Sequence, residues 1–238
     1  MNSTRKIAVI TGVIFIIATV SSLLATAVTT VQTGTDYLTW FSAHTNQLAV
    51  GAFLYIVAYF ASAGIAIAMY PVMKGSNPGL ALGSVIFRTI EVAFYMVGLL
   101  CLLSLPTLGQ QFTTAGAADR TSLRAIGDLS VNVHDHAALL GVFAFCLGAF
   151  MYYYLFFQSR LIPRWLSGFG IVAIILMMAG CVLSLFSGNR ITSYIPLVFP
   201  IFLQEMVLAV WLIVKGFNPS VIASKSGKKE MNELLSMA

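Results

Sequence analysis

Six long apolar stretches dominate the sequence and limit what the chain can fold into. An α-helix needs about 20 mostly apolar residues to cross a hydrocarbon core roughly 30 Å thick. The stretches cover residues 7–31, 46–70, 80–103, 133–157, 165–187 and 196–216. They do not alternate apolar with polar residues, as the strands of a membrane β-barrel do. We therefore predict an all-α fold, an integral membrane bundle of six transmembrane helices.

The composition excludes a soluble globular protein. Hydrophobic residues make up 59% of the chain and charged residues 9%, whereas soluble domains hold about 45–50% and about 25%. A net charge of +5 would suggest nucleic acid as a partner of a soluble chain. In a membrane protein the positive charge gathers in cytoplasmic loops, so we expect the lipid bilayer as a partner and no nucleic acid.

The positive charges also predict the topology. Six spans place both termini on one side of the membrane. Nine of the 13 Lys and Arg residues then lie on the side of the termini, and Arg88 lies inside a span. The opposite side holds Arg120, Arg124 and Arg190. Because positive residues favour the cytoplasmic side, we predict that both termini are cytoplasmic.

The spans and their connections form one domain, residues 1–217. Most connections are short, and the exception is a long outer loop at residues 104–132, in which the charge spacing from Asp119 to Asp128 suits a short surface helix. A loop of this length serves either as a lid over a site or as a solvated connector. The tyrosines at 152–154 are typical of a membrane interface. Residues 218–238 form a basic tail, which we expect to be flexible.

Three charged residues lie deep within the predicted spans. Arg88 and Glu91 are three residues apart, which places both on one face of the third span, and Glu205 lies at similar depth in the sixth, beside Gln204. A lone charge at the membrane centre costs about 2.5–3.5 kcal/mol, so such groups face inward and find partners. We expect Arg88 to pair with Glu91 and to reach Glu205. The cluster is either a buried clamp that fixes helix register or a polar site for a head group, an ion or a proton.

The histidines lie near the outer ends of two spans. His44, His134 and His136, with Asp135, are residue types that bind zinc or copper. The spacing argues against a shared site, because helical residues two apart point about 200° from each other. In the alternative interpretation, Asn132 caps the fourth span and Asp135 lies in its first turn, where an acid favours the helix dipole.

Several short segments carry a family resemblance. They are Ala68 to Pro71, Asn77, Leu80 to Leu82, Phe87 to Glu91, Ser159 to Leu166 (SRLIPRWL), Glu205 and Trp211 to Phe217 (WLIVKGF). In this order they resemble the bacterial DUF4386 family of membrane proteins. The resemblance implies a multi-pass protein of a bacterial cytoplasmic membrane. It implies no mechanism.

Three functional hypotheses follow. The first is non-enzymatic: the chain binds, senses or transports a small amphiphile or lipid through Arg88, Glu91, Gln204 and Glu205. The second is a membrane-embedded, metal-assisted lipid hydrolase that uses the outer His and Asp residues, although the sequence has neither an HExxH helix nor a Ser/His/Asp arrangement. The third is a structural subunit of a membrane complex. Six spans suit a monomeric cavity or one half of a homo-oligomeric pathway.

Overall fold

The computed structural model describes residues 3–29 and 37–222, and these residues fold into helices without any strand. The elements are α1 (Ser3–Val28), α2 (Tyr37–Ala43), α3 (Thr45–Met73), α4 (Pro78–Thr114), α5 (Ala117–Ser159), α6 (Arg164–Ser187), the 3-10 turn η1 (Ile191–Tyr194) and α7 (Ile195–Val214). Six helices are long and apolar enough to cross a membrane: α1, α3, α4, α5, α6 and the η1–α7 segment. The predicted all-α fold with six spans is confirmed.

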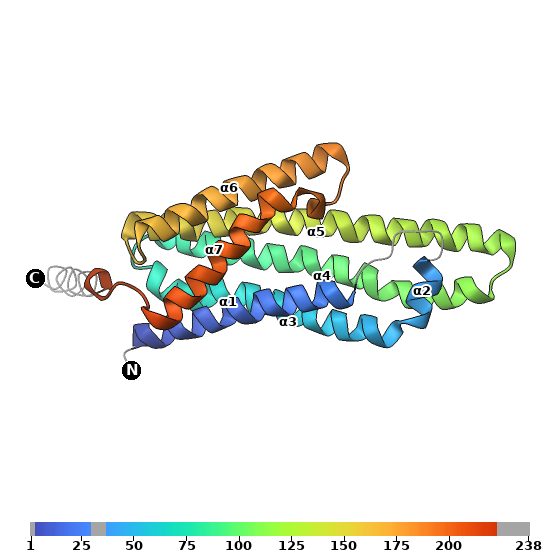
Figure 1. Ribbon diagram of the computed structural model, residues 1–238, viewed down its shortest axis with the longest axis horizontal. Coiled ribbons are helices and arrows are strands. Elements are labelled where there is room, and N and C mark those ends of the chain that lie inside the picture. The colour runs from blue at the N-terminus through green and yellow to red at the C-terminus, as the bar shows by residue number, and fades with distance from the viewer. Residues whose placement is uncertain (1–2, 30–36, 223–238) are drawn as a thin grey trace, which may run out of the picture.

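The helices form an elongated bundle with the start of α1 and the end of α7 at one end of its long axis (Figure 1). We call this the termini end, and the opposite end, where α4 turns into α5, the hairpin end. The most extensive packing joins α4 to α5, α1 packs on α3 and α7, and α6 packs on α5 and α7. Short connections between consecutive spans make most of these neighbours antiparallel, as in other helical bundles.

The helices follow the predicted spans closely at some ends and run past them at others. The end of the first predicted span, at residue 31, lies outside the described residues, as does most of the predicted tail, residues 223–238. Residues 219–222 of that tail are helical. At the termini end, α7 stops at Val214, two residues before the predicted boundary, and Gly216 then adopts a positive φ of 76°.

The segment 104–132 was expected to be a long loop with a short surface helix from Asp119 to Asp128. Those residues are helical, but the expected loop around them is wrong. The segment is helical except at Ala115 and Gly116, because α4 and α5 both continue beyond their apolar stretches and form a helical hairpin. One face of each extension has a packing partner. Leu105, Pro106 and Gly109 of α4 and Gly127 of α5 are buried, and the hairpin covers α2 at that end (Figure 1). The extensions are helical because they bury this face, although they are too polar to resemble spans.

Helix α2 links the hairpin end to a small second core. Its Tyr37 hydroxyl donates a hydrogen bond to Oδ1 of Asp128 on α5 at 2.8 Å. Burial, followed by the Asp128 carboxylate, raises the pKa of the Tyr37 hydroxyl, which therefore remains a donor. Leu38 and Phe41 of α2 pack with Leu102 of α4 in an apolar cluster separate from the main core.

The N-terminal helix caps the last helix. The Arg5 guanidinium donates hydrogen bonds of 2.5 to 3.1 Å to three carbonyl oxygens at the end of α7, those of Leu212, Ile213 and Val214. The last carbonyls of a helix have no partner within it and attract positive charge. Arg5 thus connects the first span to the last.

Candidate functional site

The centre of the candidate site is an ion pair on the buried face of α4. Arg88 and Glu91 are one helical turn apart, and Arg88 Nη1 lies 3.1 Å from Glu91 Oε2. The two residues are only 2% and 3% exposed. The pairing expected from their spacing is therefore present, with both charges inside the bundle.

Two neighbouring helices hold the pair in place. On α3, the Ser62 hydroxyl donates to Glu91 Oε1 at 2.8 Å, and the Ser62 carbonyl accepts from Arg88 Nε at 3.3 Å. On α5, the Phe145 ring lies 4.6 Å from the guanidinium carbon of Arg88, a cation–π contact. Gly148 makes room for the arginine stem, since a Cβ there would lie 3.2 Å from Arg88 Cγ. The charged groups of α4 are thus held by contacts from α3 and α5.

Helix α7 contributes the other two predicted residues, and they have different environments. Gln204 is fully buried, accepts a hydrogen bond from the Tyr153 hydroxyl, and donates to the Leu166 carbonyl of α6 at 3.2 Å. Glu205 is partly exposed. It interacts electrostatically with Arg88 and Glu91, but among the described residues it forms no ion pair. Arg88 was expected to contact Glu205 as well, and the structure shows only a longer-range electrostatic interaction between them.

Four buried polar atoms of this cluster lack a hydrogen-bond partner within the described parts of the chain. They are Arg88 Nη1, Glu91 Oε2, the Tyr152 hydroxyl and Glu205 Oε1. The first two face each other at ion-pair distance without hydrogen-bond geometry. An unpaired polar atom in an apolar interior is costly. The Tyr152 hydroxyl and the Glu205 carboxylate are close enough to interact with each other. Helices α4, α5 and α7 thus bring together polar groups whose hydrogen bonding is incomplete.

The outer histidines each have a local partner. The His44 ring stacks on Trp40 at 4.4 Å between centroids. The Nδ1 atom of His134 lies 3.0 Å from the Gly98 carbonyl oxygen, and that of His136 lies 2.7 Å from the Asn132 carbonyl oxygen. Asn132 does not cap a helix, because α5 begins 15 residues earlier, at Ala117; the capping alternative is wrong.

A second group of polar residues lines a cavity of about 430 Å³ among α1, α3, α5, α6 and η1. His134, Asp135 and His136 are among its lining residues, and His44 is not. Asp135 Oδ2 accepts a hydrogen bond from Arg190 Nε at 2.7 Å in an ion pair. Across residues 3–29 and 37–222, no three His, Cys, Asp or Glu residues are grouped to hold a metal ion. The zinc or copper site stays a prediction.

The sequence interpretation missed three contributors to the cluster of Arg88, Glu91, Gln204 and Glu205. Ser62 was not among the predicted site residues, and Tyr152 and Tyr153 were interpreted as interfacial aromatics. Both tyrosines are fully buried, beneath α6 and α7. The sequence signal that could have predicted them is the presence of polar residues at similar depth in several spans.

The comparison with known proteins identifies a family and assigns no activity. No curated protein matches the chain, and no solved structure matches it. A family model described as a domain of unknown function, DUF4386, matches residues 10–216. Because this match covers most of the 238 residues, the chain belongs to the DUF4386 family of domains of unknown function.

Proposed function

We propose that this membrane protein binds a small amphiphile or lipid, for sensing or transport, at the cluster of Arg88, Glu91, Gln204 and Glu205. The observation that carries the proposal is the set of buried polar atoms on α4, α5 and α7 that form no hydrogen bond of good geometry among the described residues. A purely structural clamp is best served by closed hydrogen bonds and balanced charges. Here Glu91 takes the one buried guanidinium, and the second carboxylate, that of Glu205, forms no ion pair in the described chain.

The charge balance defines the head group. A second carboxylate next to a closed ion pair is destabilised unless it gains a hydrogen-bond donor or a positive charge. A head group with a hydroxyl, amide or amine supplies the donor to Glu205 and, for the first two, an acceptor for Arg88. A carboxylate head group would add a like charge and is expected to be rejected.

Glu205 is the proposed point of entry to the cluster. Arg88 and Glu91 are enclosed, whereas Glu205 is partly exposed, although it shares its face of α7 with the buried Leu208 and Leu212. An amphiphile that enters between the helices therefore meets Glu205 before the enclosed ion pair. We place this protein in a bacterial cytoplasmic membrane.

A panel of 18-carbon amphiphiles that differ only in head group tests the proposal. Purified protein in a mild detergent is mixed with oleyl alcohol, oleamide, oleylamine or oleate, and the unfolding temperature Tm is measured. A ligand that binds the folded state raises Tm by mass action. We expect the alcohol, the amide or the amine to raise Tm, and oleate to have no effect. In Glu205→Gln, binding of the amine is expected to weaken about tenfold or more, as for the loss of a charged hydrogen bond.

Thr89→Ala is the matched control. Thr89 lies on α4 between the two charged residues, is exposed, and hydrogen-bonds its own helix at the Val85 carbonyl. This variant should respond to the panel as the parent protein does. Equal Tm responses to all four compounds, unchanged in Glu205→Gln, would contradict the proposal and leave the cluster as a clamp of helix register.

A further inference from the structure

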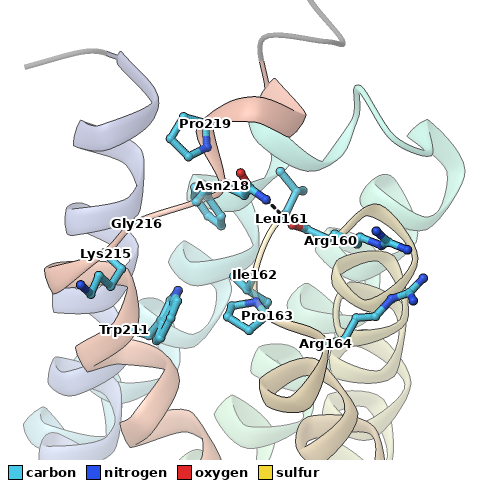
Figure 2. Close-up of a pocket in the computed structure, with 11 residues that line it drawn as sticks. Arg160, Leu161, Ile162, Pro163, Arg164, Trp211, Lys215, Gly216, Asn218 and Pro219 are labelled. Carbon is cyan, nitrogen blue, oxygen red and sulfur yellow. Dashed lines mark hydrogen bonds between the residues drawn. The ribbon is translucent and has the colours of Figure 1, made fainter.

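A cavity of about 610 Å³ opens at the termini end, between the α5–α6 connection and the end of α7 (Figure 2). The two segments singled out in the sequence, residues 159–166 and 211–217, meet here. The lining residues that matter most are Arg160, Pro163, Arg164, Trp211, Lys215 and Asn218. None of its lining residues belongs to the cluster of Arg88, Glu91, Gln204 and Glu205.

The walls of the cavity are fixed. The Asn218 backbone N–H donates to the Leu161 carbonyl at 2.9 Å, and the Asn218 side-chain amide donates to the Arg160 carbonyl at 3.5 Å. Leu161, Ile162 and Phe217 are buried in the main core. The chain leaving α7 is therefore anchored to the α5–α6 connection, and the hollow between them is part of the fold.

The charge at this end has one sign. Residues 3–8, 70–80, 157–167 and 211–222 include six cationic residues and no Asp or Glu. Three of the six cations line the cavity. Figure 2 shows Lys215 on one side of the cavity and Arg160 with Arg164 on the other, with both guanidinium groups pointing away from the cavity, that of Arg164 over the Phe157 ring. The outer rim of the cavity thus favours an anion.

The cavity wall between these charges is apolar. Its residues are of the kinds found where a transmembrane helix leaves the membrane. The Trp211 indole and the Pro163 ring face each other across the cavity (Figure 2). Trp211 also packs edge-on against the largely exposed Trp165, with ring centroids 6.3 Å apart. Tryptophans gather where apolar chains meet head groups. A ligand here contacts charge at the mouth and apolar surface inside.

Arg160 occupies a backbone position that favours glycine. It follows the last residue of α5 with φ of 57° and ψ of 28°, a left-handed conformation. Among the described residues it is the one non-glycine with positive φ. Glycine is the usual residue at such a helix end because it has no Cβ strain there. The backbone turn alone does not favour arginine here, so we infer that the Arg160 side chain has a function of its own.

We propose that this cavity binds the phosphate head group of an anionic phospholipid. The phosphodiester lies at the Arg160 and Arg164 rim, where guanidinium groups match phosphate oxygens, and α6 begins there with the positive end of its dipole. The glycerol and acyl chains lie against Trp211 and Pro163. Basic pockets between membrane helices bind anionic head groups in this way. The site shares no residue with the proposed amphiphile site, so each can fail alone.

The test measures binding of the first phosphatidylglycerol to the full-length protein by native mass spectrometry in a mild detergent. Phosphatidylcholine with the same acyl chains is the neutral comparison. Arg160→Gly is expected to weaken the first phosphatidylglycerol about fivefold, and Arg160→Gln/Arg164→Gln about 30-fold, with phosphatidylcholine unchanged. Arg160→Gly should also keep or raise Tm, since glycine relieves the left-handed strain. Opposite effects on binding and Tm exclude misfolding as the cause.

The double variant Lys6→Gln/Lys74→Gln is the charge-matched control. Both lysines are exposed at the same end and lie outside the cavity lining. Its phosphatidylglycerol binding should match that of the parent protein. An equal loss in this control would assign binding to general surface charge and overturn the proposal. Binding of glycerol 3-phosphate alone, with the same dependence on Arg160, would overturn it in favour of a soluble phosphate ligand.

Discussion

At the scale of single residues, the stability of the bundle interior depends on the buried Arg88–Glu91 pair, in which each charge compensates the other. Removing one partner leaves a buried charge without compensation, whereas removing both leaves an apolar core. Arg88 has additional contacts with the Ser62 carbonyl and the Phe145 ring. The interaction of Arg88 with Glu91 is therefore expected to dominate the effect of any substitution at either position.

A double-mutant cycle tests this expectation. Arg88→Met is expected to lower the free energy of unfolding by about 3–5 kcal/mol, because Glu91 is left buried without a cation. Arg88→Met/Glu91→Leu should recover most of that loss. Unfolding by SDS titration in mixed micelles gives the four values of the cycle. A double variant as unstable as Arg88→Met would mean that the pair is not coupled and that Arg88 acts through Ser62 and Phe145.

The sequence alone predicted part of this cluster. Charge in an apolar span and a spacing of three residues are local features, so the Arg88–Glu91 pair was accessible without a structure. Ser62 and Tyr153 were not, because their roles depend on how α3, α5 and α7 lie against one another. Tyr153 is buried through its bond to Gln204, and no local pattern distinguishes such a tyrosine from an interfacial one.

At the scale of elements, hydropathy located the spans but not the helix ends. Helix α4 has 37 residues and is therefore about 55 Å long, well beyond a hydrocarbon core of roughly 30 Å. Hydropathy falls where the helix leaves the membrane. The helix itself ends later, at Thr114, where Ala115 turns to extended backbone before Gly116. Apolar patterning thus predicts membrane spans better than it predicts helices.

The contact between the first and last spans is an element-scale prediction. Arg5→Gln removes the charged donor from the end of α7 and is expected to lower the free energy of unfolding by about 1–3 kcal/mol. Lys6→Gln, one position along and exposed, is the control and should change it by less than about 0.5 kcal/mol. Both are measured by SDS titration. Equal effects of the two variants would show that net charge, and not the cap, is responsible.

At the scale of the whole molecule, the two ends differ in their charge pattern. The described residues of the termini end carry cations alone, whereas the far half carries Arg120, Arg124 and Arg190 among the acids Asp119, Asp128 and Asp135. One of these cations is neutralised by the Arg190–Asp135 ion pair. A membrane protein orients its uncompensated Lys and Arg toward the cytoplasm. The fold thus separates a cationic end from a mixed one, and this separation predicts the orientation of the bundle.

Labelling of single cysteines in intact bacteria tests that orientation. Cys101, Cys146 and Cys181 are first replaced by alanine, and one cysteine is then placed at either end. Gly116→Cys lies at the hairpin turn, where a side chain meets nothing within 4 Å, and exposed Gly75→Cys lies between α3 and α4 at the termini end. With cytoplasmic termini, a membrane-impermeant maleimide labels position 116 in intact cells and position 75 only after permeabilisation. The reverse pattern would place the cationic end outside, and would also move the proposed phospholipid site to the outer leaflet.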